Sequence, residues 1–387
     1  MRIGYLLHSP VPGPTTNAEQ AVNALAALAG HDGLMVDLCV PAPAGSLPEV
    51  GSREAAIERN YGLPGGTFGP ALRLREMPLP AWADGRLRGL LFDLHAAPWV
   101  RHEHYDALYT RDPITLIGAL TTGVPVIFET YRTDINQSPL WWPFRRVAYG
   151  AANLAGIIVH SRVARQAFVD AGVDEARVLL AYNGFSRSSD GPPPARDVAR
   201  RALQLPTDRP IVCYAGGVGR HKGTDVLAAL ARLVPEALFL IVGAAPDAVA
   251  PPPEKWADNL RLLPRVPPAS LSAYLAAADV LVLPPTARHL IASGRTVLPI
   301  KIFAYLAAGR PILAPELPDI GEVLSAENAM MVQPDDLPAA AAALRRVLAD
   351  PLLAERLTAA ALRTANMFTW QARASVVGAF LRQRLSA

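Results

Sequence analysis

Short apolar strands alternate with amphipathic helices along almost the whole chain, and this alternation constrains the fold more than any other feature. The helical run "NAEQAVNALAALAG" follows the strand "IGYLL", and "LMVDLCV", "ALYT", "VPVIFE", "GIIVH" and "RVLLAYNG" continue the series of strands. Asn17 and Gln20 have the spacing of a capping box, which predicts that the first helix begins there. Strands that alternate with helices form parallel sheets covered on both faces, so the pattern predicts an α/β fold.

A segment rich in Ser, Gly and Pro, "SRSSDGPPPARD" at 186–197, is typical of a linker. A second series of strands and helices follows it, from "IVCYAGG" to "VLVLPP". A chain of 387 residues is also longer than one core usually serves. We therefore predict two doubly wound, Rossmann-like domains, at 1–190 and 198–368. Ligands of such sheets bind at the carboxyl ends of the strands, here in a central cleft that the two domains face.

The composition excludes several classes of protein. With 51% hydrophobic and 18% charged residues, the chain can bury a large core and is not disordered. A net charge of +3 is small for this length and does not indicate a nucleic-acid partner. Cys39 and Cys213 lie far apart in apolar runs, which predicts two buried thiols. We recognise no signal peptide or membrane span, so we expect a cytoplasmic protein, at most peripheral at the inner membrane face.

The stretch "YAGGVGRHKG" at 214–223 follows a predicted strand and opens a helix. Its glycines allow a ligand to approach the backbone, and a helix N-terminus there would offer N–H groups to an anion. Arg220 and Lys222 add positive charge. Taken alone, the stretch is explained equally well as a tight connection between a strand and a helix.

A second positively charged helix start lies in "LPIKIFAYLAAGRPIL" at 298–313. The helix is expected to begin near Pro299 and to end before Gly309. Lys301 then lies in the first turn, where the helix dipole disfavours a cation, and this hints at a bound anion. Together with the stretch at 214–223, it predicts a cradle for a diphosphate.

The order of these motifs closely resembles that of a family 4 retaining glycosyltransferase with the GT-B fold. The matching residues of the second half are "YNG", "YAGGVGRHKGTDVL", "LIVGAAPD", "RVPPASLSAYLAAADVLVLPP" and "LPIKIFAYLAAGRPIL". The first half matches more loosely, through "YTRDP" and "GVPVIFETYR". The tail "FTWQARASVVGAFL" fits as well, and the resemblance implies that a last helix, at 369–387, crosses back to the N-terminal domain.

The resemblance implies transfer of a hexose from a nucleotide-sugar donor to a glycan or glycolipid acceptor, with retention of configuration. A departing nucleoside diphosphate develops negative charge, and positive groups aimed at it lower the barrier. The chain has no Asp-x-Asp motif, so we expect no metal and no other cofactor, and Lys222 and Lys301 would stabilise the diphosphate. The residues that this implies for the donor site are Gly216, Gly217, Arg220, Lys222, Val266, Thr296, Val297, Leu298, Lys301 and Ala304.

Several of these positions have particular roles by resemblance. Lys222 matches the diphosphate-binding lysine of the family, and backbone at 216–217 and 297–298 would contact the diphosphate. Gly217 stands where the family often has an arginine, for which Arg220 is a candidate substitute. Val266 matches the position whose backbone commonly holds the nucleobase.

Ala304 departs from the family pattern, in which a Glu-x7-Glu pair is common and its second glutamate binds the donor ribose. By register, Thr296 and Ala304 occupy the two glutamate positions. Three interpretations stay open: a natural enzyme with another ribose contact, an engineered inactive variant, and a protein that binds nucleotide sugar without turnover. Ala304 is also simply a good helix former.

The acceptor is expected to meet loops of the first domain. In "FETYR", Glu129 could position or deprotonate an acceptor hydroxyl, and Tyr131 stands where relatives often place a histidine. An equal alternative is that Glu129 is a structural partner of Arg111 or Arg132. His8 follows the first strand and faces the predicted cleft, although a lone histidine is more often a structural hydrogen-bonding group.

Two further segments of the first half have alternative explanations. "PLWWPFRRVAY" at 139–149 could touch a lipid-linked acceptor or an anionic membrane, but a buried corner before a helix is the favoured explanation. "GLPGGTFGPALRLREMPLP" at 62–80 is predicted to be a long irregular loop. A GT-B sugar-nucleotide epimerase is a rival function, but it would require acid and base residues that the chain does not plainly offer.

Overall fold

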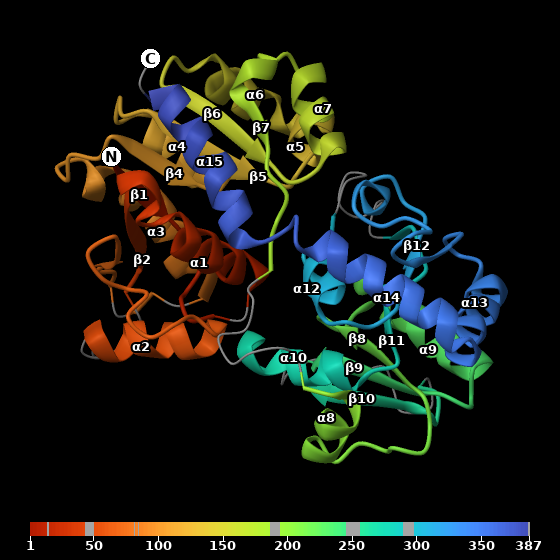
Figure 1. The fold of residues 1–387 in the computed structure, drawn as a ribbon. Helices are drawn as coiled ribbons and strands as arrows, with labels where there is room; N and C mark the ends of the chain where they lie inside the picture. Colours follow the sequence, from red (N-terminus) through yellow and green to blue (C-terminus); the bar gives the residue numbers. More distant parts are fainter. Residues whose placement is uncertain are drawn as a thin grey trace. The chain divides into compact units, whose positions relative to one another are not determined.

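The computed structural model describes residues 1–13, 15–42, 50–80, 82–83, 85–185, 194–244, 256–288 and 298–385. The chain divides into two compact units, of which the first joins Met1–Gly184 to Trp370–Ala387 and the second is Phe185–Thr369 (Figure 1). Among the described residues, no helix combines the length and the apolar character that crossing a membrane requires.

The first unit contains a seven-stranded parallel sheet in the order β3-β2-β1-β4-β5-β6-β7. Its strands are β1 (Arg2–Leu6), β2 (Met35–Pro41), β3 (Leu72–Met77), β4 (Ala107–Thr110), β5 (Val126–Thr130), β6 (Leu154–Val159) and β7 (Val178–Leu180). The strand order reverses between β1 and β4, which is the topological switch of a doubly wound sheet. The carboxyl ends of all these strands lie at one edge.

Helices cover both faces of this sheet. They are α1 (Thr16–Leu28), α2 (Val50–Tyr61), α3 (Gly85–Val100), α4 (Pro113–Leu120), α5 (Asp134–Gln137), α6 (Trp142–Gly150), α7 (Arg162–Asp170) and α15 (Trp370–Leu385). The core on one face includes side chains of α1, α2 and α15, and the core on the other includes those of α3, α4, α6 and α7. Figure 1 shows α15 lying along the first unit, where it packs on α1.

Two local predictions for the first unit are wrong. The first helix is capped by Thr15, whose Oγ1 accepts from the Ala18 N–H at 3.2 Å, so the capping box at Asn17 and Gln20 does not exist. The predicted loop at 62–80 contains β3, which pairs with β2. The glycines and prolines that flank β3 are typical of a loop, so the sequence pattern does not indicate this strand.

The second unit contains a six-stranded parallel sheet in the order β10-β9-β8-β11-β12-β13. Its strands are β8 (Ile211–Ala215), β9 (Leu238–Ala244), β10 (Leu260–Pro264), β11 (Val280–Val282), β12 (Ile312–Pro315) and β13 (Met330–Val332). Its helices include α8 (Arg196–Ala202), α9 (Thr224–Leu233), α10 (Pro268–Ala277), α12 (Lys301–Ala307), α13 (Leu337–Ala349) and α14 (Pro351–Ala365). Two parallel α/β sheets in two units confirm the predicted fold class.

The structure also refines the predicted boundaries. Residues 186–193 of the predicted linker lie outside the described residues, and Arg196 and Asp197 already belong to α8. The helix expected from Pro299 begins at Lys301, and Gly309 follows its end with a φ of +67°. Cys39 and Cys213 are buried and unbridged, as predicted.

Candidate functional site

The turn after β8 has a backbone that only glycine adopts readily. Gly216 has a φ of +149°, Gly219 of +154° and Gly223 of +72°. A Cβ added to Gly216 would lie 2.4 Å from Lys301 Nζ, and one added to Gly243 would lie 2.4 Å from the Gly216 carbonyl oxygen. The glycines therefore permit close packing of this turn against α12 and the end of β9.

Lys301, the first residue of α12, points its ammonium group at this turn. Its Nζ lies 3.8 Å from the centroid of the Tyr214 ring, in a cation–π contact. Burial and the nearby Lys222 ammonium hold the pKa of Lys301 well below its usual range. Within the described part of the chain, neither lysine forms an ion pair with a carboxylate. Two cations without a counter-ion beside a glycine turn can stabilise an anionic group.

The structure brings only some of the other predicted donor residues close to this turn. Arg220 and Lys222 lie in a 3-10 turn at Arg220–Lys222, just before α9, and both are exposed. Val266 is half-buried, two residues after β10. Leu298 is buried, and Ala304 is half-buried on α12, one turn after Lys301. Gly217 has open space where a Cβ would lie.

Thr296 and Val297, which complete the predicted donor site, lie outside the described residues. Among the described residues, Lys301 interacts with Gly216, Tyr214 and Lys222. Arg220 and Val266 lie near the carboxyl edge of the second sheet.

Glu129, at the end of β5, is buried in a polar cluster of the first unit. Its carboxylate accepts from the Tyr109 hydroxyl and from Arg373 Nη2 at 2.9 Å, and it lies 3.7 Å from Arg111 Nε. Despite burial, the charges of Arg373 and Arg111 hold the pKa of Glu129 well below its usual range. A carboxylate that is ionised and enclosed in this way favours the structural alternative, with Arg111 as one of its partners.

His160 adds a further partner to the same carboxylate. Its Nε2 lies 2.7 Å from Glu129 Oε1, and its Nδ1 lies 3.3 Å from Asn183 Nδ2. Burial lowers the pKa of His160 to about 4, so the ring is neutral at physiological pH. Tyr131 is 48% exposed, and its ring is stacked against that of His160, with 6.5 Å between centroids.

Sequence reasoning missed His160 and Arg373 as members of this cluster. A signal for Arg373 exists, because it is the one charged residue among the inward positions of α15, which are otherwise apolar. His160 ends the apolar strand run "GIIVH", and its neighbour Ser161 caps α7. Neither residue could be identified as a partner of the Glu129 carboxylate without the tertiary structure.

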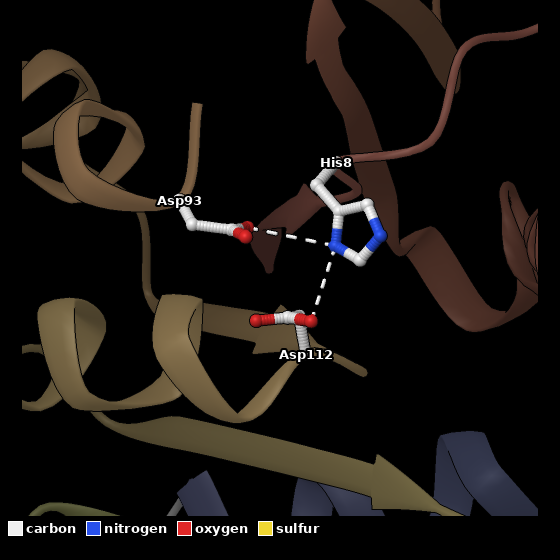
Figure 2. A group of neighbouring side chains, drawn as sticks. All are labelled: His8, Asp93 and Asp112. Atoms are coloured by element: carbon white, nitrogen blue, oxygen red, sulfur yellow. Dashed lines mark ion pairs between the residues drawn. The ribbon is translucent and has the colours of Figure 1, made fainter. Parts of the chain in front are cut away.

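His8 forms a separate cluster with Asp93 of α3 and Asp112, the residue that caps α4 (Figure 2). Its Nδ1 lies 3.2 Å from Asp112 Oδ2 and 3.6 Å from Asp93 Oδ1. These two carboxylates raise the pKa of His8 to about 10, so the ring is an imidazolium at neutral pH. These two ion pairs favour the structural role of His8.

Two family models match the sequence in consecutive regions. Residues 16–188 match the model described as Glycosyltransferase Family 4, and residues 209–350 match the one described as glycosyl transferases group 1. The first match lies in the first unit except for its last few residues, and the second lies in the second unit.

Curated proteins with similar sequences are glycosyltransferases. The chain is 27% identical over 240 residues to D-inositol 3-phosphate glycosyltransferase of Kineococcus radiotolerans, which covers 56% of this chain and 54% of that protein. It is 23% identical over 274 residues to a sulfoquinovosyl transferase of Arabidopsis thaliana, covering 67% of this chain and 50% of that protein. The chain thus spans about half the length of the curated relatives it matches.

Solved structures with the same fold cover the whole chain. Sucrose-phosphate synthase from Thermosynechococcus elongatus superposes with a TM-score of 0.78 at 19% identity, over 100% of this chain and 99% of that one. Anabaena HepE in complex with UDP-glucose superposes with a TM-score of 0.67 at 17% identity, over 100% of both chains. Each family match covers less than half of the chain, and the superpositions show the GT-B fold over its length.

Proposed function

We propose that this protein transfers a hexose from a nucleotide-sugar donor to a glycan or glycolipid acceptor, with retention of anomeric configuration. The observation that carries the proposal is the pair of lysines, Lys222 and Lys301, beside the Gly216 turn. Both lack a carboxylate partner among the described residues, and Gly216 leaves the space that Lys301 Nζ occupies. HepE, which shares the fold, was solved with UDP and with UDP-glucose.

In this proposal the two lysines act on the leaving group. As the bond between sugar and diphosphate breaks, negative charge grows on the diphosphate oxygens, and fixed cations lower the energy of that state. The backbone of Gly216 and Gly217 would approach the diphosphate, and Arg220 would add charge from the exposed 3-10 turn. Because this cationic set can act alone, we propose that neither a metal nor another cofactor is needed.

Acceptor recognition is assigned to the first unit. Tyr131, which is 48% exposed, would offer its hydroxyl to an acceptor sugar. Glu129 would act as a positioning residue, because it fixes His160, against which the Tyr131 ring stacks. We propose that the reaction takes place in the cytoplasm, at the inner membrane face, in the synthesis of a polysaccharide or glycolipid.

Ala304 weakens the donor site in this proposal. A carboxylate that binds a ribose hydroxyl contributes roughly 1.5–3 kcal/mol, which corresponds to about tenfold to a hundredfold in affinity. Ala304 lies one turn after Lys301 on α12, so a glutamate there would project from the helix that presents the lysine. A second candidate function, binding of nucleotide sugar without turnover, is favoured by this same alanine.

The test is calorimetric titration of UDP, GDP and ADP, and of their common sugars, into the chain and into Ala304→Glu. We expect one nucleotide to bind, the glutamate to tighten it by about tenfold to a hundredfold, and donor turnover to appear or rise. Ala304→Leu is the control, because it adds volume without an acceptor of hydrogen bonds. If no nucleotide binds to any of the three proteins, the donor-site assignment fails; binding without turnover in all of them supports the second candidate.

A further inference from the structure

One side of the first unit exposes large apolar side chains from several helices. They are Leu87, Leu90 and Leu94 of α3, Ile114 of α4, Leu140 of the 3-10 turn Pro139–Trp141, and Trp142 and Val147 of α6. We call this set the apolar face. Leu140 is 84% exposed and Trp142 is 53% exposed, so these side chains are far more open than a core requires. Clustered exposure of this kind is typical of an interaction surface.

The helices that carry the apolar face belong to one layer of the first unit. α3 contacts α4, and α4 contacts α6. Between them lies a pocket of about 310 Å³, lined by Leu94, Pro113, Ile114, Ile117, Gly118, Trp141 and Phe144 and, as its one charged residue, by Asp93. The lining is almost wholly apolar, so the pocket suits a hydrocarbon chain and not a sugar.

Positive charge predominates on this side, where Asp112, the cap of α4, is half-buried and paired with His8. Helices α3, α4 and α6 and the turn Pro139–Trp141 contain a single acidic residue, Asp93, which is buried. Arg146 is exposed, with its guanidinium 5.4 Å from the Trp142 ring centroid, and Arg132 lies 5.3 Å from the Trp141 ring centroid. Of these two indoles Trp142 is exposed and Trp141 is half-buried. An arginine close to an exposed indole combines apolar and cationic contact at the same place, as interfacial segments do.

We propose that the apolar face docks on the surface of an anionic lipid bilayer, with an acyl chain of that bilayer entering the pocket. Leu140 and Trp142 enter the boundary between headgroups and chains, while Arg146 contacts lipid phosphates. The favoured expectation from sequence, a buried corner at 139–149, holds only in part: Trp141, Phe144 and Tyr149 pack on the core, whereas Leu140, Trp142 and Val147 are exposed. This inference rests on the proposed function and adds to it the partner of the first unit, an anionic bilayer.

A second copy of the chain is a poorer occupant of the same face. In a symmetric dimer the same patch of both subunits forms the interface, so the charges and shape of the patch must be complementary to those of its own copy. Here Arg146 would face a surface without an exposed carboxylate on these helices. A bilayer rich in anionic lipid supplies both the missing negative charge and the apolar phase.

The test is co-sedimentation of the full chain with two kinds of vesicle, phosphatidylcholine alone and phosphatidylcholine mixed equally with phosphatidylglycerol. We expect binding to the mixed vesicles and little to the neutral ones. Leu140→Ser combined with Trp142→Ser should lower the partition coefficient at least tenfold, and Arg146→Glu should lower it on anionic vesicles only. Both changes lie at exposed positions, and the melting temperature checks that the variants fold.

Matched controls come from the second unit. Leu352→Ser, at a side chain that is 78% exposed, and Arg356→Glu, also exposed, should leave vesicle binding unchanged. The proposal is overturned if the unchanged chain stays in solution with both vesicles, or if the controls reduce binding as much as the face variants. It is also overturned if the face variants change only the oligomeric state.

The same variants separate this inference from the proposed function. Nucleotide titration in solution needs no vesicle, so loss of vesicle binding with intact nucleotide binding supports the docking face. Vesicle binding by a chain that binds no nucleotide would leave the docking face standing and remove the proposed function.

Discussion

Lys301 presents a cation in surroundings that disfavour its charge. Its pKa is lowered by burial and by Lys222, so part of the population is neutral where a solvated lysine, with a pKa near 10.4, would be charged. A diphosphate favours the ammonium form. Binding of a nucleoside diphosphate should therefore bring a proton onto Lys301, and affinity should fall as pH rises above the pKa that Lys301 has in the empty site.

The measurement is titration of UDP at about pH 8, where the nucleotide phosphate is already ionised, in two buffers with different enthalpies of ionisation. The difference in observed heat gives the number of protons taken up. Lys301→Arg is the control, because arginine stays charged and removes the uptake. Equal heats in both buffers for the unchanged chain would contradict this account of Lys301.

Arg373 provides a second residue-scale prediction. Its guanidinium donates to Glu129 at 2.9 Å in a buried pair, whereas Arg382 on the same helix pairs with exposed Asp32 at 2.8 Å. Removing one partner of a buried pair costs about 3–5 kcal/mol, and removing an exposed pair costs about 0–1 kcal/mol. Since Arg111 still neutralises Glu129, we expect Arg373→Ala to lower the unfolding free energy of the first unit by about 3 kcal/mol.

The measurement is urea unfolding of Arg373→Ala and of Arg382→Ala. Both variants lose an arginine side chain, the first from the buried pair and the second from the exposed pair. Equal losses in the two variants would show that burial is not what makes the Arg373 pair matter. Glu129→Gln completes a double-mutant cycle that isolates the pair itself.

At the scale of the element, the turn between β8 and α9 depends on Gly216. A Cβ there would lie 2.4 Å from Lys301 Nζ, and its φ of +149° strains any other residue. Gly216→Ala should displace Lys301, and we expect UDP affinity to fall at least tenfold while the unit stays folded. Gly321→Ala, in the same unit and with nothing within 4 Å of its added Cβ, should leave the affinity unchanged. Titration of both variants with UDP measures the affinity, and circular dichroism checks that they fold. Equal affinities of the two variants would contradict the role of Gly216.

The element scale also shows what sequence patterns can provide. β8 and α9 lie where "IVCYAGG" and the following helix were predicted, because apolar runs and glycine turns are local signals. The start of α1 was misplaced, because Thr15 and Asn17 are both acceptable caps and only geometry selects Thr15. Lys301 could be assigned to the site by its helix position, while its contact with Tyr214 required the fold.

At the scale of the whole molecule, long-range contacts set the limit of prediction. Arg373 and Glu129 are 244 positions apart, and no local pattern joins them. The same holds for the apolar face, whose members come from α3, α4 and α6 and become one surface only when these helices pack. The residue types at 139–149 can be read from the sequence, but their exposure cannot, because neighbours from distant segments decide which side chains are buried.

The first unit should depend on its last helix. Ala374, Val377, Phe380 and Leu381 of α15 are buried in the core that α1 and α2 share. A chain that ends at Thr369 should leave this core open, so the first unit should unfold while the second keeps its own melting transition. Calorimetry shows whether one transition is lost. A chain that ends at Leu385 is the control and should keep both.

The chain passes from the first unit to the second at Gly184 and returns at Trp370. A backbone bridge between Phe185 and Thr369 holds the two ends of the second unit together. During synthesis the ribosome therefore completes the second unit while the first still lacks α15. The part of the protein that is made first is finished last, and until α15 emerges its exposed core is the part of the nascent chain that chaperones must protect.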